Sequence, residues 1–227
     1  MSTARKKWNS RVKQLHIVTP FSRLYLFDTL VNLLKPLNVQ WHLMTEQPMV
    51  NTLLPIIKLY EATDWIHPVE TPTRPIDWSI CWRKINQFIN TQNIVDVDYY
   101  TIMNDDDAIE SSAVEELKKT DAEIVVISMK RGDRTPRHLN GAPPRWSPHG
   151  FSTLLASPEC MKPGSIGPNQ IIYSGKIFRT LQYKNVYAAD GEMAEYVFNT
   201  YKDKIVYKPE LFALFNYYEP TRWDKLT

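Results

Sequence analysis

YYTIMNDDDAIESS, residues 99–112, joins a short apolar run to three consecutive carboxylates, Asp105, Asp106 and Asp107. The run is rich in β-branched and aromatic residues, as buried strands are. A serine and a glutamate at residues 112–115 then have the spacing of a helix N-terminus. Like charges this close repel one another, so the triplet requires either open water or a bound cation. The stretch therefore predicts a strand and a helix joined by an acidic turn.

Strand-like and helix-like segments alternate on both sides of this stretch. Short apolar runs typical of buried strands cover residues 15–19, 39–44, 65–69, 123–129 and 170–173. Segments typical of helices cover residues 21–34, 53–60, 80–88, 112–119 and 193–201. This alternation favours parallel strands joined by right-handed crossovers. We therefore expect a single-domain α/β fold with a Rossmann-like, mixed and mostly parallel sheet flanked by helices.

The composition is that of an ordinary folded protein. The chain has 227 residues, of which 43% are hydrophobic, and this is ample for a sizeable core. We find no internal repeat and no convincing linker, so we expect a basic lead-in at residues 1–13 followed by one domain at residues 14–227. A net charge of +2 is too small to indicate a nucleic-acid partner.

Cysteine usage and hydropathy bear on the compartment. Cys81 and Cys160 lack CxxC spacing, which excludes a thiolate zinc site and favours a reducing compartment. Neither a secretory segment nor an apolar run of about 18 residues occurs in the sequence. A cytoplasmic protein is expected, with possible peripheral membrane contact through the basic residues 1–13.

Polar residues follow two of the predicted strands at their carboxyl ends. Thr19 and Pro20 lie at the end of the first strand, and the acidic triplet follows the strand at residues 99–103. Ligands of open parallel sheets bind at such ends. An acidic cluster binds phosphate through a shared divalent cation. The pattern therefore predicts a nucleotide diphosphate held by a metal ion.

This layout resembles the GT-A class of nucleotide-sugar-dependent glycosyltransferases, whose signature is an apolar strand ending in Asp-x-Asp. Asp105 and Asp107 occupy the two signature positions, and the likeness covers about residues 14–200. The resemblance implies a nucleotide-binding half at residues 14–129 and an acceptor-side half at residues 130–227. It implies a metal-dependent transfer of a sugar, with UDP as a guessed carrier, to a glycan, a lipid-linked or a protein acceptor.

The resemblance also implies which residues contact the donor. Thr19 and Pro20 would lie beside the base and ribose, and Arg83, Lys84 and Asn86 would supply further donor contacts from the helix that precedes the acidic strand.

A manganese or magnesium ion would lie between the acidic triplet and the donor. Asp105 and Asp107 are the expected ligands, with His149 or His138 from the aperiodic stretch at residues 130–150, or water, completing the sphere. Asp105 and Asp106 are also expected on the nucleotide side, although Asp106 suits a structural role best.

ADGEMAEYVF, which contains Asp190 and Glu192, resembles the segment from which inverting members of this class draw the catalytic base. Asp190 is the expected base and Glu192 is the alternative. If configuration is retained, the reaction needs no such base, and the sequence leaves this open.

Simpler interpretations remain for each of these features. The acidic triplet could be a solvated turn beside a helix N-terminus. Asp190 could be only a helix cap. His16 and His42 lie within strand patterns and are expected to be core or interface histidines. A nucleotidyltransferase and a non-catalytic binding module are the alternative functions. The first usually carries a glycine-rich basic loop near its N-terminus, which residues 14–35 lack.

Overall fold

The computed structural model describes residues 13–71, 80–131, 152–186 and 189–215 of the chain. Within these ranges, nine strands form one sheet in the order β3-β2-β1-β4-β8-β6-β9-β5, with β7 paired to β6. The strands are β1 (Leu15–Pro20), β2 (Gln40–Glu46), β3 (Ile66–Thr71), β4 (Tyr99–Ile102), β5 (Ala108–Ile109), β6 (Ile124–Arg131), β7 (Ser152–Leu154), β8 (Ile171–Ser174) and β9 (Ile205–Phe215). The α-helices are α1 (Phe27–Leu34), α2 (Gln47–Leu59), α3 (Ile80–Thr91), α4 (Ser111–Leu117), α5 (Gly175–Phe178) and α6 (Ala189–Tyr201).

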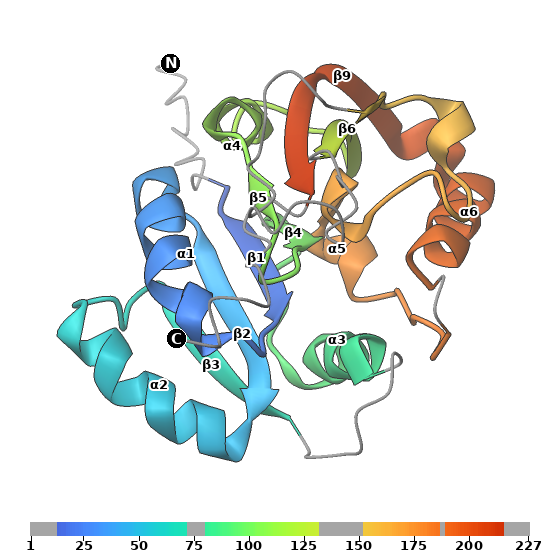
Figure 1. Ribbon diagram of the computed structural model, residues 1–227. Coiled ribbons are helices and arrows are strands. Elements are labelled where there is room, and N and C mark those ends of the chain that lie inside the picture. The colour runs from blue at the N-terminus through green and yellow to red at the C-terminus, as the bar shows by residue number, and fades with distance from the viewer. Residues whose placement is uncertain (1–12, 72–79, 132–151, 187–188, 216–227) are drawn as a thin grey trace, which may run out of the picture.

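The first half of the sheet is parallel, as the sequence predicts. β1 pairs with β2 on one side and with β4 on the other, and β2 pairs with β3. Five of the six residues of β1 are buried, because helices cover both faces of the sheet (Figure 1).

The second half of the sheet makes it mixed. β8 runs antiparallel between β4 and β6, while β6 and β9 are parallel with a register shift at Ile127 and Ser128. At the C-terminal end of the described residues, Ile205–Phe215 form the single strand β9 of 11 residues. The α/β class with a mixed, Rossmann-like sheet is therefore confirmed, and the parallel pattern is continuous only from β3 to β4.

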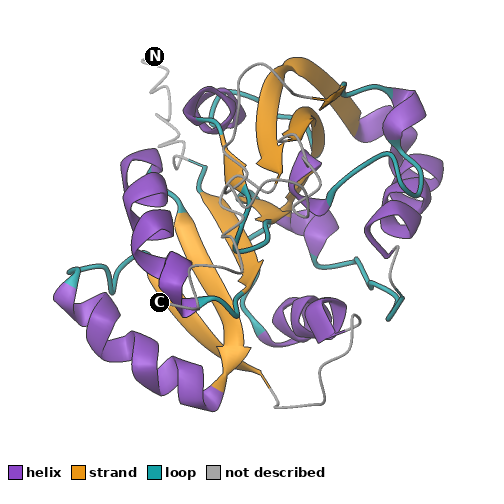
Figure 2. Cartoon of the chain, in the orientation of Figure 1, coloured by secondary structure: helices purple, strands orange, loops and turns teal. Residues whose placement is uncertain are grey.

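Helices pack on both faces of the sheet (Figure 2). Alternate residues of β1 enter two different cores, since Ile17 packs in a cluster with residues of α1, α2 and α4. Val18 packs in the second cluster, with residues of α3, α5 and α6. This period of two explains why β1 is apolar on both sides.

Two expected helix starts are wrong. The helix expected from residue 21 does not begin there, because the pairing of β1 with β2 continues to the Phe21 N–H, which donates to the Met44 carbonyl at 3.1 Å. α1 therefore begins later, at Phe27. α4 begins at Ser111 with Glu110 as its N-cap and no side-chain cap, so Ser112 is not the N-cap that the spacing of residues 112–115 predicts.

None of the helices in the described ranges is long and apolar enough to cross a membrane. Residues 1–12 lie outside those ranges, so the cytoplasmic location and the peripheral membrane contact stay predictions. Lys13, the last residue of the lead-in, is attached to the fold. Its Nζ donates to the Thr120 carbonyl at 2.6 Å and to the Asp121 carboxylate at 2.7 Å.

Candidate functional site

The order of the strands creates a switch point between β1 and β4. From β1 the chain adds β2 and then β3 on one side, whereas β4 lies on the other side of β1. β1 and β4 are parallel, with Leu15 opposite Tyr99 and Val18 opposite Ile102. Open α/β sheets bind ligands outside the carboxyl ends of strands at such a point. The segments that leave β1 and β4 therefore form the candidate edge site.

Asp105 joins these two segments. Its side chain is buried, and its Oδ2 accepts hydrogen bonds from the Ser22 N–H at 2.9 Å, the Ser22 hydroxyl at 3.2 Å and the Arg23 N–H at 3.0 Å. One carboxylate oxygen therefore holds the backbone of the segment that follows β1.

The cation next to the acidic triplet is Arg23. Its Nη1 lies 2.6 Å from Asp106 Oδ2 and 3.2 Å from Asp105 Oδ1. The side chain of Arg23 keeps 35% of its surface exposed, whereas the Asp105 side chain is 3% exposed. The sequence pattern did not indicate a role for Arg23. Its signal was a basic residue three positions after the end of a buried strand.

The side chain of Asp107 contacts Asn104, a residue of the same loop. Asp107 is fully buried, its Oδ2 accepts a hydrogen bond from Asn104 Nδ2 at 3.2 Å, and its N–H donates to the Asn104 carbonyl at 3.2 Å. Asp107 is thus engaged by protein groups, as Asp105 and Asp106 are.

This arrangement does not fit the expected metal site. In the described part of the chain, no group of three or more His, Cys, Asp or Glu side chains is arranged to hold a metal ion. Both oxygens of Asp105 already face donors from Ser22 and Arg23. His149 and His138 lie outside the described residues. Binding of manganese or magnesium at Asp105 and Asp107 stays a prediction, and no step proposed below depends on it.

Lys84 supplies a second cation to this edge. It lies on α3, is 8% exposed, and interacts electrostatically with Glu46 at the end of β2 and with Asp105. Burial lowers the pKa of Lys84, and these negative groups oppose that shift. Burial likewise raises the pKa of Asp105, and Arg23 opposes it. Arg83 is half-buried beside Lys84 on the same helix.

Two residues expected to contact the nucleotide are engaged by protein groups, and their contact with a nucleotide stays a prediction. The Thr19 hydroxyl is buried and accepts a hydrogen bond from Trp41 Nε1 at 2.9 Å, so it faces the core. Asn86 is buried against the Tyr183 backbone, donating from Nδ2 to the carbonyl at 2.7 Å and accepting the N–H on Oδ1 at 2.8 Å. Pro20, the last residue of β1, is the first-strand residue that remains at the edge.

The candidate bases lie at the start of α6. Asp190 Oδ1 accepts the Gly191 N–H at 2.9 Å and interacts electrostatically with Tyr173 and Tyr183, two buried phenols. Trp82 of α3 stacks on Tyr183 with ring centroids 5.0 Å apart. α3 therefore connects the edge site, through Lys84, to the surroundings of Asp190.

Glu192 faces a different space from Asp190. Its carboxylate pairs with Lys184 Nζ at 2.8 Å. Both line a cavity of about 360 Å³, together with Thr180, Gln182, Ala189, Met193 and Tyr196. The two candidate bases therefore have different neighbours. Asp190 lies near Tyr183, which stacks on Trp82 of α3, whereas Glu192 lines the cavity.

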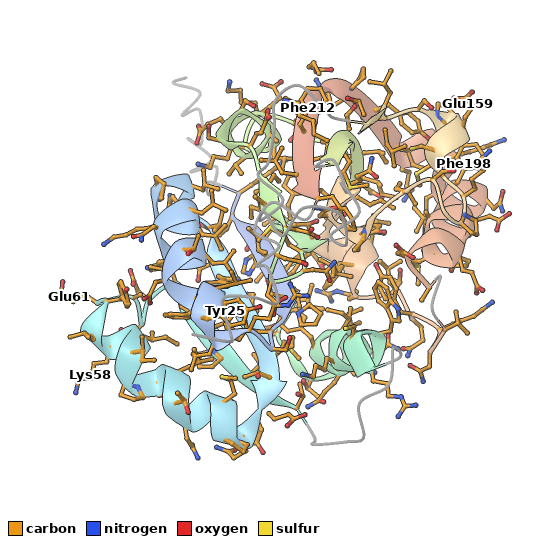
Figure 3. All side chains as sticks on the ribbon, in the orientation of Figure 1. Tyr25, Lys58, Glu61, Glu159, Phe198 and Phe212 are labelled. Atoms are coloured by element: carbon orange, nitrogen blue, oxygen red, sulfur yellow. The ribbon has the colours of Figure 1, made fainter. Side chains whose placement is uncertain are left out.

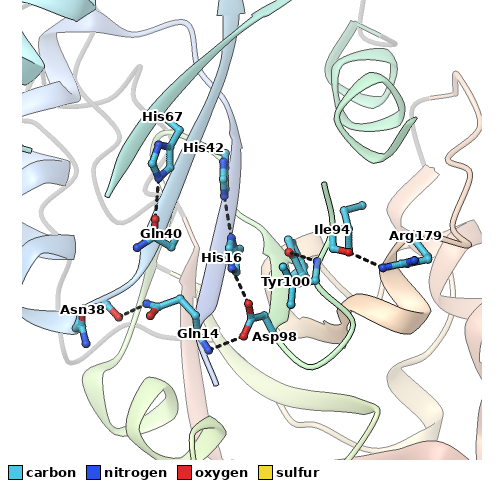
Figure 4. A network of polar contacts seen from close by, with 11 residues as sticks. Gln14, His16, Asn38, Gln40, His42, His67, Ile94, Asp98, Tyr100 and Arg179 are labelled. Carbon is cyan, nitrogen blue, oxygen red and sulfur yellow. Dashed lines mark hydrogen bonds and ion pairs between the residues drawn. The ribbon is translucent and has the colours of Figure 1, made fainter. Parts of the chain in front are cut away.

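A row of three histidines crosses the sheet away from this edge (Figure 4). His16 Nδ1 lies 2.9 Å from His42 Nε2, and His16 Nε2 lies 3.5 Å from Asp98. The His42 and His67 rings have centroids 5.1 Å apart, and His67 Nε2 lies 2.7 Å from Gln40 Oε1. His16 and His42 are half-buried within their strands and their rings contact one another, as expected of core or interface histidines.

The known protein families and the curated proteins give no match to this sequence. Among solved structures, the chain is similar to HddC from Yersinia pseudotuberculosis complexed with GMP-PN, with a TM-score of 0.44 and 10% identity over 94% of this chain and 100% of that chain. It is also similar to 4-diphosphocytidyl-2C-methyl-D-erythritol synthase, with a TM-score of 0.44 and 8% identity over 83% of this chain and 86% of that chain. Neither is described as a glycosyltransferase, and likeness at this level carries no argument about activity.

Proposed function

We propose that the chain is a transferase that binds a nucleotide-linked sugar at the carboxyl ends of β1 and β4 and moves the sugar to a hydroxyl acceptor. The observation that carries this proposal is the switch point, where Arg23 and Lys84 lie at one edge of a parallel sheet. A diphosphate is the ligand class that two cations at such an edge suit best.

The chemistry assigned to this edge is stabilisation of a leaving group. In glycosyl transfer, the acceptor oxygen forms a bond to the anomeric carbon while the bond from that carbon to the diphosphate oxygen breaks. Negative charge then grows on the diphosphate, and Arg23 and Lys84 would stabilise it. In an inverting reaction Asp190 would take the proton of the acceptor hydroxyl. The acceptor would be a glycan, a lipid-linked sugar or a protein.

A nucleotidyltransferase is the second candidate, because the same two cations suit pyrophosphate as a leaving group equally well. In that reaction an acceptor phosphate attacks the α-phosphate of a nucleoside triphosphate and pyrophosphate departs. The two similar solved structures have TM-scores of 0.44, which are too low to decide between the two reactions.

The test is a product assay on the full chain. We expect incubation with UDP-, GDP- and dTDP-sugars, with and without manganese, to release free nucleoside diphosphate with at least one donor. Release of pyrophosphate from nucleoside triphosphates and sugar phosphates would support the second candidate instead.

The Arg23→Ala variant should lower the release at least about tenfold, because a hydrogen bond to a charged group is worth roughly 1.5–3 kcal/mol. Lys58→Ala is the control. Lys58 lies on the outer surface of α2 (Figure 3), and its loss should change nothing. Absence of turnover with all donors would contradict the proposal. Equal turnover by Arg23→Ala would remove Arg23 from the role of stabilising the leaving group.

A further inference from the structure

A protein cation, Arg23, already lies between Asp105, one of the two expected metal ligands, and Asp106. Arg23 Nη1 lies within 3.2 Å of Asp105 Oδ1 and 2.6 Å of Asp106 Oδ2. A magnesium or calcium ion takes carboxylate oxygens at about 2.0–2.6 Å. A divalent ion bound to these oxygens would therefore be forced against the guanidinium, and like charges at that separation repel strongly.

The guanidinium is held in place from two directions. Asp105 Oδ1 faces Nη1, while Asp105 Oδ2 accepts the backbone N–H of Arg23 and that of Ser22. The same carboxylate thus orients both the start and the end of the Arg23 side chain. Hydrogen bonds of this kind fix the rotamer of a binding side chain before the ligand binds.

Arg23 retains hydrogen-bond donors for a ligand. A guanidinium carries five N–H donors in a planar fork. Among the described residues, its carboxylate partners are reached through Nη1, and the side chain keeps 35% of its surface exposed. The N–H groups on Nη2 and Nε match the spacing of two phosphate oxygens.

From this geometry we infer that Arg23, positioned by Asp105 and Asp106, binds the diphosphate of the nucleotide directly, in place of a divalent metal ion. The inference rests on the proposed function, since it describes how the same edge site holds its ligand. Asp105 and Asp106 are then positioning residues, and nucleotide binding does not require manganese or magnesium.

Isothermal titration calorimetry tests this with UDP, GDP, dTDP and inorganic pyrophosphate as probes. Each probe is titrated into the full chain in buffer with EDTA, and again with manganese. We expect at least one nucleoside diphosphate to bind in EDTA with a Kd within about threefold of its value in manganese.

Variants separate the roles of arginine and metal. Arg23→Ala should weaken binding about tenfold or more under both conditions, because hydrogen bonds to charged groups are lost. Arg23→Lys, which keeps the charge without the fork, should restore part of the affinity. Asp105→Asn should weaken binding equally with and without manganese, while Lys58→Ala should bind as the wild type does. Circular dichroism checks that each variant is folded, and Arg23→Lys carries the comparison if Arg23→Ala does not fold.

The outcomes distinguish this inference from the proposed function. Binding that appears only with manganese, and that survives in Arg23→Ala, would overturn the inference and leave the nucleotide site standing. A loss in Asp105→Asn that is confined to the manganese series would also overturn it, because it would mark Asp105 as a metal ligand. Failure of every probe under both conditions would overturn the inference and the proposed function together.

Discussion

At the scale of single residues, the acidic triplet both marks the end of β4 and binds the segment that follows β1. Three adjacent carboxylates require compensation, and the chain supplies it from Arg23, which lies more than 80 positions away in the sequence. With Arg23 beside them, Asp105 and Asp106 repel one another less. Asp105 can then bind the backbone of the segment that follows β1. Asp105, Asp106 and Asp107 are therefore partly structural whatever ligand the edge binds.

The hydrogen bond between Thr19 and Trp41 is expected to stabilise the fold. Thr19→Val should cost about 1–3 kcal/mol in the free energy of unfolding, because Trp41 Nε1–H would be left buried without its acceptor. Urea denaturation measures this cost, and Thr19→Ser should recover most of it. Nucleotide affinity of Thr19→Val should match the wild type. A loss of affinity with unchanged stability would instead support the original expectation that Thr19 contacts the nucleotide.

At the scale of elements, α3 and α6 carry candidate site residues that are far apart in the sequence, Lys84 and Asp190. α3 presents Lys84 toward Asp105, and Asn86 fastens the Tyr183 backbone beside α6. The contacts of α3 thus span from the edge site to the surroundings of Asp190. Through Trp82 and Asn86, α3 brings residues of the first half of the chain into contact with Tyr183 of the second half.

The start of α6 depends on a close backbone contact. A Cβ at Gly191 would lie 2.3 Å from Pro163 Cα, so this position allows no side chain without a shift of backbone. Gly191→Ala should destabilise the fold by about 1–3 kcal/mol through overpacking. It should also lower transferase activity further, because Asp190 is the preceding residue.

Thermal or urea unfolding together with the product assay measures both effects of Gly191→Ala. Glu195→Ala, an exposed change on the same helix, is the control and should shift stability by less than about 0.5 kcal/mol. A Gly191→Ala protein with wild-type stability would show that α6 is not seated against Pro163 as described.

At the scale of the whole molecule, the histidine row makes stability depend on pH. Burial and the neighbouring His16 and His67 lower the pKa of His42 to about 3. Its pKa in the unfolded chain is about 6.5. The unfolded state therefore takes up a proton before the folded state does as the pH falls.

Stability should be complete above about pH 6.5 and should be lost progressively toward about pH 3, by an amount on the order of a few kcal/mol. The pKa of His67 is also lowered by burial, so it acts in the same direction. Urea midpoints between pH 4 and pH 8 measure the effect, and His42→Gln should flatten the acid side of the curve. An equally steep loss in His42→Gln would assign the acid sensitivity to other groups.

Local patterns in the chain were sufficient to predict the strands β1, β2, β4 and β6, the α/β class, and the position of the acidic triplet at a strand end. These properties follow from apolar periodicity, which depends on neighbouring residues only. Periodicity did not predict that β8 lies antiparallel between β4 and β6, because strand pairing is a long-range choice.

The roles of individual polar side chains were decided by the tertiary structure. Thr19 was expected at a ligand and faces Trp41, Asn86 was expected at a donor and holds Tyr183, and Arg23 was not expected at all. A buried polar group takes the partner that folding brings within hydrogen-bond distance, and sequence spacing does not reveal that partner. The sequence alone therefore placed the acidic turn at the edge of the sheet, and only the packing of β1 against β4 brought Arg23 to it as its cation.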